Sequence, residues 1–204
     1  MINSIDYNNY IYFFIFTGFW KPQNPFHDNY NLLMHAKIYS AIAVLLANQY
    51  SMSVDDVEQV IGGLVYGLVQ KDDLALIKVC LKDAQSLEGQ LQTAITDIVK
   101  GDITDIIAGV EILGQVLQEL PADLSDCQGM QPDIDRIEKW AAIFNDPTTL
   151  VKTIATNVFS NYADIKAEIS QTEADISASQ WYTTGSDVAD ILVLSLGPVP
   201  ESQW

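Results

Sequence analysis

Residues 74–121 read LALIKVCLKDAQSLEGQLQTAITDIVKGDITDIIAGVEILGQVLQELP, and apolar residues recur in them at about every third or fourth position. This spacing places apolar side chains on one face of an α-helix. Gly101 and Asp102 interrupt the pattern, and Pro121 follows its last leucine, as expected at helix ends. The stretch therefore predicts two long helices, 74–100 and 103–120, joined by a short turn as an antiparallel hairpin.

The two cysteines of the chain fit this hairpin. Cys80 precedes Gly101 by about 21 residues and Cys127 follows it by about 26, so both should lie at the open end of the hairpin. A disulfide between them would close a loop of about 48 residues and contribute about 4 kcal/mol. Such a bridge indicates an oxidising compartment. The alternative is a pair of unrelated buried thiols.

The rest of the chain after residue 53 has the same helical spacing, and no stretch alternates with the period of a β-strand. Ser53 is expected to cap the first helix, with Asp56 in the capping-box position. The further expected helices are 54–70, 132–144, 147–176 and 180–196. The fold class is therefore predicted as an all-α antiparallel bundle of about five to six helices with one disulfide.

Two glycines in the first helix, Gly63 and Gly67, lie four residues apart and so share one helix face. Small residues at this spacing allow another helix to approach closely, although each glycine lowers helix stability by about 1 kcal/mol. The alternative, which we favour from the sequence, is that they accommodate a side chain of a neighbouring helix.

The first 53 residues differ from the rest. Residues 1–33 are rich in asparagine and aromatic residues, and they are either an arm that packs on the domain or translated upstream sequence before a start at Met34. Residues 34–53 resemble a signal peptide, with Lys37, an apolar core at 38–47 and a cut expected after Ser53. An ordinary buried helix at this position is the alternative. The remaining divisions are a helical domain, 54–197, and a short tail, 198–204.

The charge excludes several classes of partner. The chain has 27 Asp and Glu against 10 Lys and Arg, a net charge of -17, and Arg136 is its one arginine. Nucleic acids and anionic membrane surfaces both require clustered basic residues, so neither is expected as a partner. The two histidines, His27 and His35, precede the expected cut, which leaves the mature chain without a catalytic or metal-binding imidazole. We expect no cofactor and no enzymatic activity.

Aspartate pairs, aromatic residues and adjacent glycines are the other candidates for a functional site. Six aspartates form close pairs, but they lack the EF-hand pattern and are better explained as helix caps: Asp72, Asp73, Asp102, Asp105, Asp133 and Asp135. Five aromatic residues could line an apolar pocket, although core packing is the plainer interpretation: Trp140, Phe144, Phe159, Trp181 and Tyr182. Gly62 and Gly63 lack the strand and lysine of a phosphate-binding loop.

Three motifs of the domain carry a resemblance: VIGGLVYGL at 60–68, CLKDA at 80–84, and the later Cys127. With a signal ahead of them, they make residues 54–197 similar to small secreted helical proteins of unknown function from ciliated protists. The resemblance implies an extracellular protein and assigns no catalytic residue.

We therefore expect a secreted, non-enzymatic structural or interaction protein that self-assembles or binds another extracellular protein. Assembly would depend on cations that screen the acidic charge and on an apolar contact. That contact is expected on the exposed edge of helix 147–176 or on the tail, with Val199 and Trp204. The alternatives are a carrier of a small apolar ligand between helices and, as a third class, a carboxylate-based hydrolase.

Overall fold

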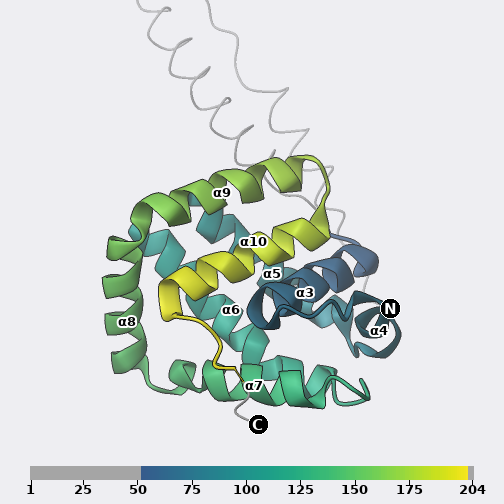
Figure 1. Ribbon diagram of the computed structural model, residues 1–204. Coiled ribbons are helices and arrows are strands. Elements are labelled where there is room, and N and C mark those ends of the chain that lie inside the picture. Colours follow the sequence, from purple (N-terminus) through teal and green to yellow (C-terminus); the bar gives the residue numbers. More distant parts are fainter. Residues whose placement is uncertain (1–51, 202–204) are drawn as a thin grey trace, which may run out of the picture. The chain divides into compact units, whose positions relative to one another are not determined.

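The structure is a computed structural model that describes residues 52–201 (Figure 1). Within that range it contains eight α-helices and one 3₁₀ helix, and no strand. The elements are α3 (Val54–Val69), α4 (Leu74–Cys80), α5 (Ala84–Lys100), α6 (Ile103–Asp123), α7 (Gln131–Ala141), η1 (Ala142–Asn145), α8 (Pro147–Ser160), α9 (Tyr162–Ser177) and α10 (Trp181–Leu196). The all-α class is confirmed for this part of the chain. The segment 1–33, nearly all of the expected signal peptide and Trp204 lie outside the described residues.

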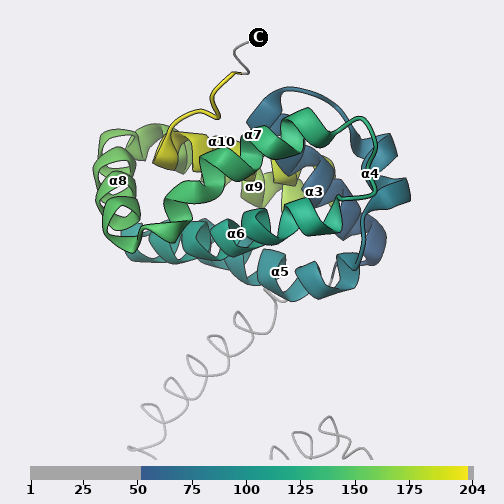
Figure 2. The ribbon, with the colours of Figure 1, turned by 90° about the horizontal axis from the view of Figure 1, so that it is seen from below.

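The predicted hairpin is present as α5 and α6, which lie side by side in Figure 2. Gly101 ends α5 with a φ of 76°, a left-handed conformation that glycine adopts easily. Asp102 caps α6 by accepting a hydrogen bond from the Asp105 backbone N–H at 3.2 Å. The disulfide joins Cys80 to Cys127 with a Cα–Cα distance of 5.2 Å. The expected bridge at the open end of the hairpin is therefore confirmed.

The expected single helix 74–100 is wrong, because the chain breaks between α4 and α5. Leu81 is extended and Asp83 has a left-handed φ of 52°. The broken segment is held by the end of α6, where the Lys82 N–H donates to the Asp123 carbonyl at 3.0 Å. Because the disulfide holds Cys80 beside the chain that follows α6, α4 turns away and packs on α3 instead of extending α5.

The expected single helix 147–176 is also divided, at Asn161. The side-chain amides of Asn157 and Asn161 donate to the carbonyls of Ser195 and Leu194, at 3.1 and 2.8 Å. These bonds occupy carbonyls near the C-terminal end of α10, which have no partner within their own helix. The chain changes direction at this point, and α8 runs across the ends of α9 and α10 in Figure 1. Because of the two breaks, the described residues form eight α-helices where five or six were expected. The expected antiparallel arrangement applies to α5 and α6, whereas α8 runs across the ends of its neighbours.

Pro121 does not end its helix, as the sequence suggested, because α6 continues to Asp123. A proline in the last turn removes one hydrogen bond, and the remaining residues of that turn keep theirs. α7 likewise begins at Gln131, one residue before the expected Pro132. Both differences are shifts of a helix end and leave the buried faces unchanged.

The most extensive helix contact in the described chain joins α3 to α10. A Cβ added to Gly63 would overlap the carbonyl oxygen of Tyr182, and one added to Gly185 would overlap that of Val60. The glycines therefore allow two helix backbones to touch, as the first interpretation proposed. The alternative favoured from the sequence, a neighbouring side chain, is wrong for Gly63, whereas Gly67 does receive the side chain of Ala189.

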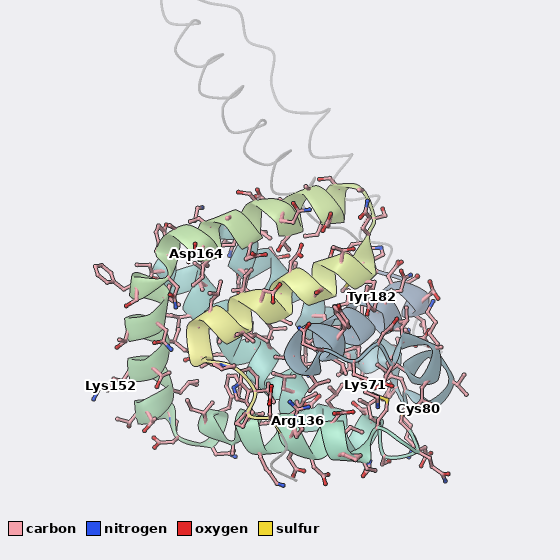
Figure 3. The ribbon with its side chains drawn as sticks, viewed as in Figure 1. Lys71, Cys80, Arg136, Lys152, Asp164 and Tyr182 are labelled. Carbon is pink, nitrogen blue, oxygen red and sulfur yellow. A yellow bond between two sulfur atoms is a disulfide. The ribbon has the colours of Figure 1, made fainter. Side chains whose placement is uncertain are left out.

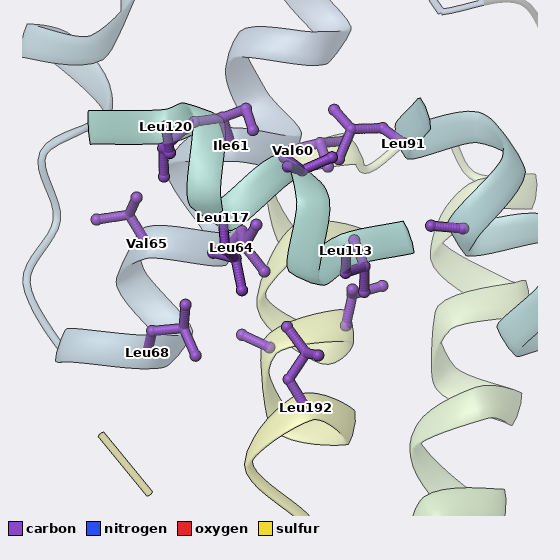
Figure 4. Close-up of a cluster of buried hydrophobic side chains, with 14 of the residues drawn as sticks. Val60, Ile61, Leu64, Val65, Leu68, Leu91, Leu113, Leu117, Leu120 and Leu192 are labelled. Atoms are coloured by element: carbon purple, nitrogen blue, oxygen red, sulfur yellow. The ribbon is translucent and has the colours of Figure 1, made fainter. Parts of the chain in front are cut away.

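All eight α-helices contribute buried side chains to the core, and Figure 4 shows a part of it formed by α3, α5, α6 and α10. Leu64, Leu117 and Leu192, from three of these helices, are fully buried and belong to one hydrophobic cluster. α7, α8 and α9 surround this centre in Figure 1. Among residues 52–201, no helix has both the length and the apolar character required to cross a bilayer.

Candidate functional site

Two carboxyl groups are buried between α9 and α10. Asp175 lies in the last turn of α9 and Asp187 in α10, and their exposed fractions are 5% and 7%. Their carboxyl groups lie close enough to interact directly. Burial and this contact with Asp175 raise the pKa of Asp187 to about 7, and the charges of Glu168 and Asp190 act in the same direction. We call Asp175 and Asp187 the carboxyl pair.

Few hydrogen-bond donors surround the carboxyl pair, so the loss of its hydration is only partly compensated. Gln171 donates its amide to Asp175 Oδ1 at 3.1 Å, whereas the Oδ2 atoms of Asp175 and Asp187 are buried without a hydrogen-bond partner in the described chain. The hydroxyl of Thr172 is turned to its own helix and donates to the Glu168 carbonyl at 2.8 Å. Two buried carboxylates in contact repel each other strongly, so one retained proton is the favourable state.

This arrangement does not resemble a glycosidase site. Catalytic carboxyls of that class flank a substrate and are separated by several ångströms. Asp175 and Asp187 contact each other instead and are closed off from solvent. The two described surface hollows lie elsewhere: one is lined by residues of α6, α7 and η1, the other by residues of α8. The carboxylate-hydrolase alternative therefore finds no support in this pair.

Sequence reasoning missed the carboxyl pair because it treated acidic residues as a solvated face. A signal was present: Asp187 is spaced three and four residues from Thr184 and Ile191, which are both buried. An acid within a buried helical stripe indicates a partner on the facing helix. The position of Asp175 at the end of α9 gave no comparable signal.

A second feature is the surface of α8. Val151, Ala155 and Phe159 follow one another at intervals of four residues and are all exposed, Phe159 at 77%. We call these three residues the outer face of α8. Residues 147–163 include no Asp or Glu, and their one charged side chain, Lys152, points away from the domain in Figure 3. A hollow of about 500 Å³ lined by four threonines, Lys152 and Asn157 lies on the same helix.

The expected tail contact is wrong for Val199, which is 7% exposed and belongs to the hydrophobic core. Two hydrogen bonds hold this segment on α7. Trp140 Nε1 donates to the Gly197 carbonyl at 3.0 Å, and Arg136 Nε donates to the Pro200 carbonyl at 3.0 Å. Val199 is therefore not available for a partner, and Trp204 lies outside the described residues.

The five aromatic residues considered for a pocket do not converge. Phe159 points to solvent, whereas Trp181 is 6% exposed and Trp140 binds the tail. Phe144 lies against Gly114, and the Tyr182 ring is 6.0 Å from that of Tyr66, centre to centre. Apart from Phe159, these residues therefore serve packing at several separate places.

The aspartate pairs also have local roles. Asp102 caps α6, while Asp133 pairs with Lys71 at 3.0 Å and with Arg136 at 3.4 Å. Asp72 accepts from the Leu74 N–H at 3.2 Å. In the part of the chain that the structure describes, no three His, Cys, Asp or Glu side chains gather as they would around a metal ion.

In the described residues, the fold and these sites define an acidic all-α protein with one disulfide, a buried carboxyl pair and an apolar edge free of acidic residues. A family model described as SctB-like, Secreted protein B-like, matches residues 37–195. Because this match covers more than half of the chain, the chain belongs to the SctB-like family. No curated protein and no solved structure matches it. The family description agrees with the expected secretion; it does not test the resemblance to proteins of ciliated protists.

Proposed function

We propose that this protein is a non-enzymatic structural or interaction protein outside the cell, and that copies of it associate through the outer face of α8. The observation that carries the proposal is the absence of acidic residues from 147–163 in a chain of net charge -17. Like charges on identical molecules oppose association. An apolar stretch without acidic residues is where that opposition is smallest.

The apolar contribution comes from Val151 and Phe159. An exposed phenylalanine that becomes buried contributes roughly 1.5–3 kcal/mol, and a partner helix can cover both residues at once because they lie on the same side. α8 forms one edge of the described domain, with no other helix outside it in Figures 1 and 2. Lys152 is the one charged side chain beside this face, so the contact brings no acidic groups of the two copies together.

The carrier alternative is less well supported by the described residues. The α8 hollow is open to solvent, whereas carrier sites enclose most of the surface of their ligand. Between the helices, leucine and isoleucine side chains fill the centre of the domain (Figure 4).

The test is the mass of the purified chain in solution, measured by light scattering after size exclusion over a range of concentrations. The salt series should extend from about 0.05 M to about 0.5 M, with and without calcium, because screening lengths shorten over that range. We expect oligomers that grow with salt, and Phe159→Ser with Val151→Ser should return them to monomers.

Val79→Ser is the matched control. Val79 is 85% exposed on α4, so its substitution removes a similar apolar group from another surface and should leave the oligomers intact. A wild-type chain that stays monomeric throughout the series would contradict self-association. Oligomers that persist in the Phe159 and Val151 variant, but dissolve in Val79→Ser, would assign the contact to another face.

A further inference from the structure

We propose that the carboxyl pair, Asp175 with Asp187, is an acid-operated contact between α9 and α10: one shared proton joins the two helices in acidic surroundings, and its loss at higher pH loosens α9 from the domain. This inference is independent of self-association. It concerns a different surface and a different property of the chain.

The geometry of the α9–α10 connection supports the proposal. The two helices are joined by a tight turn in which Ser179 has a left-handed φ of 56° and the Gln180 N–H donates to the Asp175 carbonyl at 2.8 Å. This turn brings the end of α9 back against α10. Asp175 therefore lies where the helix dipole already disfavours negative charge.

The other ionisable groups near Asp187 strengthen the effect. Glu168 on α9 and Asp190 on α10 add negative charge, and the pKa values of both are themselves raised, chiefly by partial loss of solvent around the carboxyl groups. The groups that act on Asp187 are Asp175, Glu168 and Asp190, all acidic and all on α9 or α10, and none of the charges that act on it comes from α3 or α8. Deprotonation would thus place a second charge in an environment that is already negative.

The direction of the pH dependence follows from the raised pKa of Asp187. Its ordinary value is 3.8 and its value in the fold is about 7, so the folded chain binds the proton more tightly than the unfolded chain. The stabilisation is fully present below about pH 4 and is lost progressively as the pH rises to about 7. A secreted chain passes from the cell to the external medium, so it meets a change of pH that can operate this contact.

α9 is the helix free to respond. It packs mainly on α10 and makes smaller contacts with α5 and α8. The other side of α10 is fixed by its close packing on α3, where glycines bring the backbones together. Loss of the shared proton should therefore loosen α9 while α3 and α10 stay together.

The experiment compares wild type with Asp187→Asn and Asp175→Asn, each as the full chain, with Asp126→Asn as the control. Asp126 is 68% exposed and pairs with Lys82 at 2.9 Å, so its substitution should leave the pH profile unchanged. We expect the urea midpoint of wild type to fall between about pH 5 and about pH 8. Hydrogen exchange in 162–177, corrected for the intrinsic effect of pH, should accelerate about tenfold or more.

In Asp187→Asn the amide can donate to Asp175 at every pH. The fall of the urea midpoint and the faster exchange of 162–177 between about pH 5 and about pH 8 should therefore disappear. If either variant fails to fold, the wild-type titration decides by itself, because the side-chain carbon signal of Asp187 must shift near pH 7 together with the exchange of α9. A wild-type midpoint that is constant or rises over this range overturns the proposal. Stoichiometric binding of calcium that restores the midpoint at about pH 8 would replace the proton contact with a cation site.

Discussion

The α-carbon of Gly185 in α10 lies so close to the carbonyl oxygen of Val60 in α3 that a Cβ at position 185 would overlap it. The reciprocal contact joins Gly63 to the carbonyl of Tyr182. The two central helices therefore meet backbone to backbone at these positions.

Gly185→Ala should destabilise the protein by about 2–3 kcal/mol or more, because the methyl group can be accommodated only if the helix backbones separate. Chemical denaturation measures this change. Gly89 is the matched control: it lies in α5, with nothing within 4 Å of an added Cβ. Gly89→Ala should raise stability by up to about 1 kcal/mol through helix propensity. Equal effects of the two substitutions would contradict the close approach.

Removal of the disulfide, by Cys80→Ala with Cys127→Ala, should lower the free energy of unfolding by about 2–4 kcal/mol, since the bridge spans 47 residues of sequence. A reductant should act on wild type to the same extent and leave the double variant unchanged. Peptide mapping without reduction should recover the linked pair. Free thiols in protein isolated under alkylating conditions would refute the bridge.

The start of α3 bears on the expected signal cleavage. Ser53 and Asp56 form the capping box, with the Ser53 N–H donating to Asp56 Oδ2 at 2.8 Å, and Met52 is 3% exposed. A cut after Ser53 would remove both the cap, worth about 1 kcal/mol, and a buried methionine, worth roughly 1.5–3 kcal/mol. We expect intact-mass analysis of the native protein to place its N-terminus at or before Met52. A native chain beginning at Val54, as stable as one beginning at Met52, would show that this prediction is wrong.

The segment after α10 should contribute to stability although it has no regular structure. Val199→Ala should cost about 1–2 kcal/mol because its side chain belongs to the core. Glu201→Ala, at an exposed position of the same segment, should change stability by less than about 0.5 kcal/mol. If thermal unfolding is the same for both variants, Val199 is not held as the structure describes.

The sequence by itself determined the helical class, the α5–α6 hairpin, the cap of α3 and the pairing of Cys80 with Cys127. These features depend on helix-period spacing, on residues at helix ends and on distances along the chain, all of which are local properties. The absence of acids from 147–163 could also be read directly. Its exposure could not, because an apolar stripe looks the same whether it faces a core or solvent.

Only the tertiary structure decided where helices break and which acids are buried. The apolar period continues through 81–83 and through Asn161, and the breaks come from hydrogen bonds to Asp123 and to the end of α10. The carboxyl pair likewise exists only because two helices bring Asp175 and Asp187 together and exclude water. Such contacts join residues that are separated in sequence, so their energies depend on the packing of the whole domain and not on any single stretch of the chain.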